Sequence, residues 1–209
     1  MGARTRKGGR RIKRKTQKKT DTEDQAATPP PRAFVFTKGK VSGALKALVE
    51  DLKSVLSPNT ARALRARKTN KLRDFVDVAG ELNVSFFLIV SATDKHSYLR
   101  VVRTPQGPTL TFRINSFSLA ADLAATLRRP YSVTQGVWQS SPLLVLSDFD
   151  KTVQHELLTS TVLQNLFPEF NVADAKLAAC RRVVLVHKTA EGETELRQYV
   201  IQAVPTGVR

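Results

Sequence analysis

Cysteine and long apolar runs are both scarce in this sequence of 209 residues. A single cysteine, Cys180, excludes an internal disulfide and a zinc site built on several thiolates. The longest clearly apolar runs, such as Phe86 to Val90, have four or five residues, whereas a membrane-spanning helix needs about 20. The first 30 residues hold no apolar core of a secretory signal, and Arg6 stands where a myristoylation signal needs Ser or Thr. We therefore expect no membrane span, no secretory signal and no N-terminal myristoyl group.

Acidic residues are few relative to basic ones. The sequence has 34 Lys and Arg against 18 Asp and Glu, which gives a net charge of +16 and an isoelectric point near 10.5. This balance indicates a polyanionic partner, with nucleic acid ahead of an anionic membrane surface. The hydrophobic share of 41% is enough for a core, and the length suits one domain or two small ones.

Much of the excess charge lies in residues 1–32, which carry 11 basic and 3 acidic side chains. Because so polar a tract cannot bury apolar area, we expect a disordered basic tail. It could serve as a solubilising or nuclear-import segment, or it could also bind phosphates, and these roles are compatible. The absence of an amphipathic face makes membrane attachment the third choice. The RNA contacts predicted in the tail are Arg10, Arg11, Lys13, Arg14 and Lys15.

Apolar periodicity from residue 33 onward predicts mixed α/β structure. The first series of expected elements is a strand at 34–36, a helix from the cap Ser42 to Leu56, weak helix over 60–82, a strand at 86–90, a hairpin of 98–103 and 109–114, and a helix capped by Ser116 or Ser118. In the second hairpin arm, Leu110, Phe112 and Ile114 share one face.

The second series repeats this order. It comprises a strand at 143–146, a helix capped by Asp148 or Asp150 and closed by Pro168, a short helix near 174–179, a strand at 183–186 and a hairpin into a strand at 196–204. The repeat predicts an internal duplication, with α/β halves at about 33–130 and 141–209 packed as one domain. The first half ends in a helix at 118–128 that the second lacks, so we expect a missing C-terminal part.

The motifs of common catalytic sites are absent. No phosphate-binding GxGxxG or GxxxxGK[ST] loop and no G-x-S-x-G nucleophile turn occurs. His155-Glu156 begins like a zinc-binding HExxH motif but lacks the second histidine. Asp148 and Asp150 could act as an acid–base pair, but helix capping explains them better. We therefore predict no catalytic residue, no metal and no cofactor.

The most informative segment is 62–73, in which six of twelve residues are basic and none is acidic. On one helix, Arg65 and Lys68, or Arg67 and Lys71, would stand three or four residues apart. A solvated surface is the alternative interpretation, but anionic phosphates would relieve the self-repulsion of such a charge cluster. The RNA contacts predicted here are Arg62, Arg65, Arg67, Lys68, Asn70, Lys71 and Arg73, with Asn70 directed at a base or a 2′-hydroxyl.

Several other arginines could be structural or functional: Arg100, Arg103, Arg113, Arg128, Arg129, Arg181 and Arg182. Aromatic residues are only 7% of the chain, and most Phe residues lie in apolar runs typical of a core. We therefore predict recognition of the RNA backbone and shape, without an aromatic platform for stacking bases.

Several strings occur in a distinctive order: Phe34-Val35-Phe36-Thr37-Lys38-Gly39, the basic run from Arg65 to Asp74, Gly107-Pro108-Thr109-Leu110-Thr111-Phe112, Pro142 to Leu146, Gln164-Asn165-Leu166-Phe167-Pro168, and Arg197-Gln198-Tyr199 before Val204-Pro205. Over residues 33–209 the chain resembles the Brix-domain family of ribosome-assembly proteins, and within it the Peter Pan branch. One departure is Thr69, where another basic residue is expected.

The resemblance implies an α/β (α+β) Brix domain of two similar halves, related to the anticodon-binding domain of class II aminoacyl-tRNA synthetases. It also implies a non-enzymatic factor of the nucleus and nucleolus. Such a factor would bind precursor rRNA of the large ribosomal subunit, with other assembly factors and ribosomal proteins as partners and no membrane contact. The alternatives are a protein–protein scaffold with a nuclear-import tail, a tRNA-binding module and, last, an RNA-processing enzyme, for which acid clusters and nucleotide loops are missing.

Overall fold

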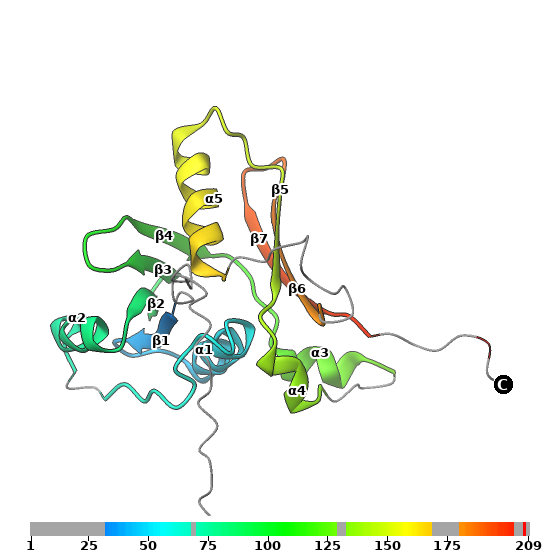
Figure 1. Ribbon diagram of the computed structural model, residues 1–209, viewed down its shortest axis with the longest axis horizontal. Helices are drawn as coiled ribbons and strands as arrows, with labels where there is room; N and C mark the ends of the chain where they lie inside the picture. The colour runs from blue at the N-terminus through cyan, green and yellow to red at the C-terminus, as the bar shows by residue number, and fades with distance from the viewer. Residues whose placement is uncertain (1–31, 68–69, 129–132, 169–179, 203–206, 208–209) are drawn as a thin grey trace, which may run out of the picture.

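The computed structural model describes residues 32–67, 70–128, 133–168, 180–202 and 207. Its strands form two sheets, and each sheet begins with a parallel pair and continues antiparallel (Figure 1). Sheet A has the order β1 (Arg32–Lys38), β2 (Val84–Ala92), β3 (Ser97–Arg103), β4 (Thr109–Ile114). Sheet B has the order β5 (Leu143–Ser147), β6 (Arg182–Lys188), β7 (Thr194–Val200). The predicted mixed α/β class is confirmed, and sheet B repeats the pairing of the first three strands of sheet A.

The helices lie between and after these strands: α1 (Gly43–Val55), α2 (Leu72–Glu81), α3 (Ala120–Thr126), α4 (Gln135–Gln139) and α5 (Gln154–Leu166). The predicted cap of α1 is confirmed, because Ser42 Oγ accepts a hydrogen bond of 3.3 Å from the backbone N–H of Leu45. This bond satisfies one of the unpaired N–H groups at the start of the helix. The apolar spacing of α1 then directs Leu45 and Val49 into the core.

The strands β1 and β2 of sheet A are apolar on both faces, since successive side chains of a strand alternate between them. On one face, Val35, Leu88 and Val90 join the main core with α1. On the opposite face, a smaller core lies under α2, where the rings of Phe36 and Phe75 stack at 4.3 Å between centroids. A fully buried side chain of this size contributes about 1.5–3 kcal/mol relative to an exposed one, so both faces fix the position of the sheet.

The two halves share the main core. Val162 and Leu166 of α5 and Val184 of β6 belong to the same buried cluster as the residues of β1, β2 and α1. Partly buried side chains of β3 and β4 pack against this cluster. Each half therefore completes the apolar burial of the other.

One arginine links the halves through polar contacts. Arg182, at the start of β6, is completely buried. Its guanidinium donates hydrogen bonds to the carbonyls of Ser54, Val55 and Ser57 at the C-terminal end of α1 and of Ser140 after α4, and it lies 4.9 Å from the centre of the Trp138 ring. A cation at a helix C-terminus satisfies unpaired carbonyls and matches the helix dipole.

Several predicted details are wrong. Ser116 and Ser118 do not cap α3, whose N-cap is Leu119 without a side-chain hydrogen bond. Neither Asp148 nor Asp150 caps α5, whose N-cap is Val153. The strand expected at 196–204 begins at Thr194 and ends at Val200, and α4 is a helix that the sequence pattern does not predict. The helix expected near 174–179 lies outside the described residues.

The start of α5 is held by the carboxylate of a residue in its own first turn. Glu156, only 9% exposed, accepts a 2.8 Å hydrogen bond from the backbone N–H of Asp150 and pairs with Lys188 of β6. The Oδ1 atom of Asp150 instead accepts from both the backbone N–H and the hydroxyl of Thr152, each at 2.8 Å. The hydrogen bond from Lys188, followed by that from Asp150, holds the pKa of Glu156 below its ordinary value.

Replacing Arg182 with alanine should lower the free energy of unfolding by about 3 kcal/mol or more, because buried carbonyls lose a charged donor. Urea unfolding followed by circular dichroism measures this change. The neighbouring Arg181 is exposed and provides the control; its replacement by alanine should change stability by less than about 0.5 kcal/mol. Equal effects of the two substitutions would contradict the role assigned to Arg182.

The variant Glu156→Gln should reduce the acid sensitivity of the fold. Because the pKa of Glu156 is lowered in the folded state, its carboxylate stabilises the protein fully above the ordinary pKa of 4.5. That contribution is lost as the pH falls through the lower folded-state pKa. Measured by thermal unfolding, the melting temperature should therefore fall less steeply from pH 6 downward for the variant than for the parent. The control Glu191→Gln, at an exposed turn position, should show the same fall in melting temperature as the parent.

Candidate nucleic-acid interface

The chain that leads into the basic segment lies along the outer edge of sheet A. The backbone N–H of Ala33 in β1 donates to the carbonyl of Asn59 at 2.9 Å, and the N–H of Ala61 donates to the carbonyl of Ala33 at 3.4 Å. The hydroxyl of Thr60 donates to the same carbonyl at 3.1 Å. These bonds pair residues 59–61 with β1, at the edge opposite β4, and so set where the basic segment starts.

A buried lysine fixes the next part of the segment. Lys53 of α1 is 5% exposed, and its Nζ donates to the carbonyl of Leu64 at 3.0 Å and to Glu50 Oε1 at 2.9 Å. The side chain of Leu64 packs against the smaller core under α2. A rigid support of this kind is typical of loops that carry function. Sequence reasoning missed Lys53, because a lysine at an inward position of a helix carries no signal of its partner.

Arg62, Arg65 and Arg67 are exposed on either side of the anchored Leu64. Residues 64–67 and 70–71 are not helical, so Arg67 and Lys71 do not stand on one helix; the pair of Arg65 with Lys68 includes a residue outside the described part of the chain. Like charges three and four residues apart destabilise a helix, and the contacts of Ala61 and Leu64 hold the backbone in another path. The three arginines nevertheless remain exposed within one short stretch of the chain.

The basic segment ends in the first turn of α2. Asn70, Lys71 and Arg73 are exposed there, and the Asp74 carboxylate accepts a 2.9 Å hydrogen bond from the backbone N–H of Lys71, the N-cap residue. The helix N-terminus adds partial positive charge. Lys68 lies outside the described residues, as do the predicted tail contacts Arg10, Arg11, Lys13, Arg14 and Lys15.

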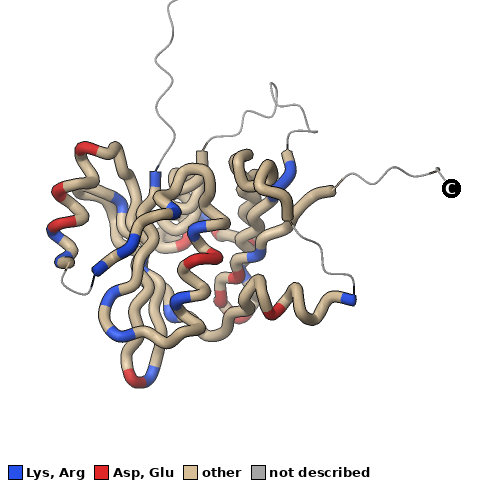
Figure 2. Tube along the Cα trace, turned by 90° about the horizontal axis from the view of Figure 1, so that it is seen from below, with Lys and Arg blue, Asp and Glu red and all other residues tan. Residues whose placement is uncertain are grey.

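The remaining described arginines divide into one structural residue and several exposed ones. Burial, followed by the nearby positive charge of Arg62, lowers the pKa of Arg182 to about 10, so its guanidinium stays charged at neutral pH. Figure 2 shows basic residues on several other segments of the trace. The exposed arginines outside the basic segment include Arg100, Arg103, Arg113, Arg128 and Arg181.

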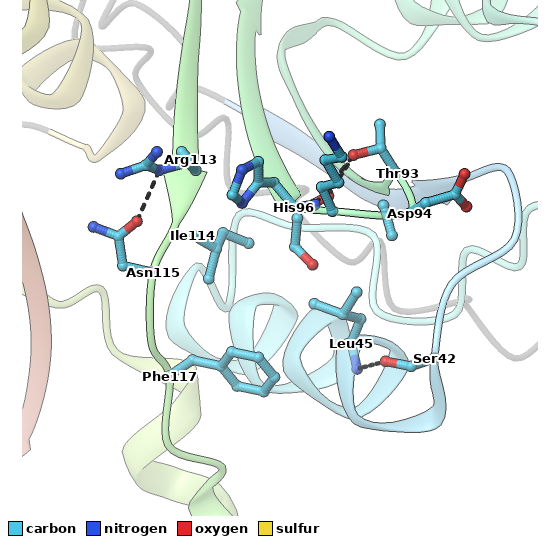
Figure 3. Close-up of a pocket in the computed structure, with 12 residues that line it drawn as sticks. Ser42, Leu45, Thr93, Asp94, His96, Arg113, Ile114, Asn115 and Phe117 are labelled. Carbon is cyan, nitrogen blue, oxygen red and sulfur yellow. Dashed lines mark hydrogen bonds between the residues drawn. The ribbon is translucent and has the colours of Figure 1, made fainter.

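A hollow of about 610 Å³ lies between the N-terminus of α1, the β2–β3 turn and the end of β4 (Figure 3). Leu45, Ile114 and Phe117 give it an apolar side, and the turn residues Thr93 to Ser97 give it a polar rim. Arg113 Nε donates to Asn115 Oδ1 at 3.0 Å. This open, mixed surface lacks the arrangement of a catalytic centre, because none of its contacts joins a nucleophile to a base.

Ser147, Asp148 and His187 meet where β5 and β6 end. His187 Nδ1 lies 2.9 Å from Asp148 Oδ2, and the Ser147 hydroxyl donates to the same carboxylate. The hydrogen bond from Ser147 is the main cause that lowers the pKa of Asp148 below its ordinary value. Desolvation opposes this shift, and the nearby His187 adds to it. The serine therefore contacts the carboxylate and not the imidazole, which is not the arrangement of an activated nucleophile.

Metal-binding clusters and membrane-spanning helices are both absent from the part of the chain that the structure describes. No three His, Cys, Asp or Glu side chains there are grouped in a way that could hold a metal ion. None of the helices there has the length and apolar character to cross a membrane.

The substitution Lys53→Met should keep the packing of the side-chain stem and remove the bond to Leu64. We expect faster amide hydrogen exchange over residues 59–67, measured by mass spectrometry, because the loop is then held by one anchor fewer. Lys46→Met alters an exposed lysine of the same helix and should leave that exchange unchanged. Unaltered exchange in Lys53→Met would show that Leu64 packing alone fixes the loop.

Comparison with known proteins agrees with the expected family. The family model described as the Brix domain matches residues 38–208. The chain is 39% identical over 201 residues to the Peter Pan-like protein of Arabidopsis thaliana, covering 96% of this chain and 57% of that protein. It is 35% identical over 207 residues to ribosome biogenesis protein SSF1 of Saccharomyces cerevisiae, covering 92% and 45%. The chain thus spans about half the length of these curated relatives.

The fold also matches a solved structure. The crystal structure of a probable ribosomal biogenesis protein from Aeropyrum pernix K1 aligns with a TM-score of 0.56 at 14% identity, over 81% of this chain and 89% of that one. At this identity the likeness concerns the fold alone. Sequence and fold together confirm the predicted family, and the chain belongs to the Brix domain family.

Proposed function

We propose that this chain is a non-enzymatic ribosome biogenesis factor that binds precursor rRNA of the large ribosomal subunit. The observation that carries the proposal is the basic segment 62–73, whose described Arg62, Arg65, Arg67, Lys71 and Arg73 are all exposed. The chain leading into it is held on the edge of sheet A by Lys53 and by pairing with β1. Its setting is a Brix domain, and matched relatives of this chain are named ribosome biogenesis proteins.

The chemistry of the segment suits an RNA backbone. Arginine guanidinium groups form paired hydrogen bonds with phosphate oxygens, and Lys71 supplies a point charge beside the N-terminus of α2. Asn70 has the donor and acceptor needed for a base edge or a 2′-hydroxyl. Phosphate contacts position a protein on RNA without reading the sequence, so specificity would come from the shape of the rRNA and from neighbouring proteins.

The remaining parts of the proposal follow the family resemblance. We assign residues 1–32 to a basic tail and 33–209 to the Brix domain, with a fold related to the anticodon-binding domain of class II aminoacyl-tRNA synthetases. The nucleus and nucleolus are the expected location. Other assembly factors and ribosomal proteins are the expected partners.

A protein–protein scaffold is a second candidate function, and the surface of α3 favours it. The α3 segment has no buried residue, and Leu123 and Leu127 are 55% and 57% exposed. Exposed apolar side chains at helical spacing are typical of protein contacts. In this case the basic tail would act only in nuclear import.

The test uses the triple variant Arg65→Glu, Arg67→Glu, Lys71→Glu, called the loop variant. Its charge-matched control is Lys40→Glu, Lys46→Glu, Lys151→Glu, which changes three exposed lysines outside the basic segment. Affinity for a large-subunit precursor rRNA fragment is measured by fluorescence anisotropy from 50 to 200 mM salt. The loop variant should bind at least tenfold more weakly than the control. Its logarithmic salt slope should fall by about 2–3, since each neutralised phosphate accounts for about 0.7–0.9 of the slope.

Equal binding by the two triple variants would overturn the assignment of the loop. Tighter binding of tRNA than of the rRNA fragment would favour the tRNA-binding module. In cells, crosslinked RNA from the parent protein should map to large-subunit precursor rRNA and be depleted in the loop variant. The scaffold would be favoured if the parent protein gave no RNA crosslink and the loop variant were still recovered in pre-ribosomal particles.

A further inference from the structure

In the part of the chain that the structure describes, the face of sheet A under α2 is only half covered. The core under α2 includes Phe34 and Phe36 of β1, Phe87 and Ile89 of β2, and the inner side chains of α2. Among the described residues of β3 and β4, only Val102 packs against this core, as a partly buried residue of β3. In Figure 1, α2 lies beside β1 and β2. The half of this face formed by β3 and β4 therefore extends beyond the helix.

Strand register fixes which side chains occupy the uncovered half. Ile89 is opposite Arg100, which is opposite Thr111; Ser91 is opposite Tyr98, which is opposite Arg113. Directly paired residues point to the same face. With Val102 and Thr109 added by the same rule, this set, which we call the open face, comprises Tyr98, Arg100, Val102, Thr109, Thr111 and Arg113.

The open face is polar, exposed and free of acid. Arg100, Thr109, Thr111 and Arg113 are exposed, and Tyr98 is half-buried. The strands β3 and β4 contain three arginines and not one Asp or Glu. Among the described residues no carboxylate pairs with Arg100, and the hydrogen-bond acceptor of Arg113 is the neutral amide of Asn115. Two guanidinium groups without a direct carboxylate partner in the described part of the chain thus lie beside one aromatic ring, and the Glu193 carboxylate is reached only through Asn115.

We propose that the open face binds a single strand of RNA, as a second contact surface beside the basic segment. The proposal rests on the RNA-binding function proposed above. Arg100 and Arg113 contact phosphates, the threonine hydroxyls contact 2′-hydroxyls, and Tyr98 stacks on one unpaired base. Charge complementarity selects an anionic occupant, and an aromatic ring on the sheet face selects unpaired bases, because bases within a duplex are not free to stack on protein.

The dimensions agree with one strand. Two adjacent β-strands present a surface about 10 Å wide, and diagonal neighbours such as Arg100 and Arg113 have side chains about 7–8 Å apart. The polar residues of the β2–β3 turn continue the surface past Tyr98, whose ring lies 6.5 Å from that of His96. An RNA strand therefore has room to follow β3 from Val102 toward the turn.

The test uses the whole chain and a single-stranded RNA of 12 nucleotides, with affinity measured by fluorescence anisotropy across a salt series. Arg100→Glu should weaken binding about tenfold and reduce the logarithmic salt slope by about 0.7 for each phosphate that is no longer neutralised. Tyr98→Ala should weaken binding about 5- to 100-fold with an unchanged salt slope, since stacking is not ionic. Tyr98→Phe keeps the ring and should bind like the parent.

Matched controls separate these effects from general ones. Tyr199→Ala removes a tyrosine of β7 that is 46% exposed, and Lys151→Glu reverses a charge at an exposed turn; neither should change affinity. Thermal unfolding of Tyr98→Ala checks that the sheet is intact, and Arg100→Glu provides an independent probe if it is not.

The outcomes for the two surfaces are distinguishable. Weaker binding by the loop triple variant, with parent-like binding by Arg100→Glu and Tyr98→Ala, would overturn the open face and leave the proposed function standing. Parent-like binding by all three variants would overturn both the open face and the proposed RNA-binding function. Loss of duplex RNA binding in Arg100→Glu, with no loss of single-strand binding, would also overturn the assignment of a single strand.

Discussion

The arrangement of this domain depends on one buried guanidinium that is solvated by carbonyl dipoles instead of being paired with an acid. Arg182 begins the second sheet's central strand, yet most of its hydrogen-bond acceptors are carbonyls at the end of α1 in the first half. One of them, the carbonyl of Ser57, lies two residues before the segment that pairs with β1. The same contact that joins the halves therefore sets where the chain leaves α1, and so where the basic loop begins. Apolar packing holds the two sheets together, but these hydrogen bonds specify their relative placement.

Most of the regular structure could be predicted because its causes are local. The periodicity of α1, its Ser42 cap and the alternation along β4 each lie within a few residues, so the sequence contains the whole signal. The cap of α5 could not be read this way. Asp150 has the chemistry of a cap, but its carboxylate turns to Thr152 while Glu156 and Lys188 supply the polar contacts. Which carboxylate holds the start of α5 is decided by competition between partners, one of which, Lys188, is distant in sequence.

The candidate interface shows the same division. The exposure of Arg62, Arg65, Arg67 and Arg73 follows from charge alone, whereas the path of the loop depends on Lys53 and on the edge of β1. Arg181 and Arg182 are indistinguishable in the sequence, yet one is exposed and the other is completely buried. The open face cannot be predicted from the sequence because it requires two facts together: the alternation of the hairpin, which the sequence contains, and the extent of α2's cover, which only the fold determines.

The absence of a carboxylate beside Arg182 among the described residues has an electrostatic consequence. Carbonyl dipoles solvate the cation but leave its full unit of charge in place, so the interior contributes a positive potential toward the surface near Arg62. Mobile ions screen charges in water over about 8–10 Å but penetrate a packed core poorly. Part of the attraction that a polyanion experiences at this domain thus originates beneath its surface, where exchange of surface lysines does not remove it.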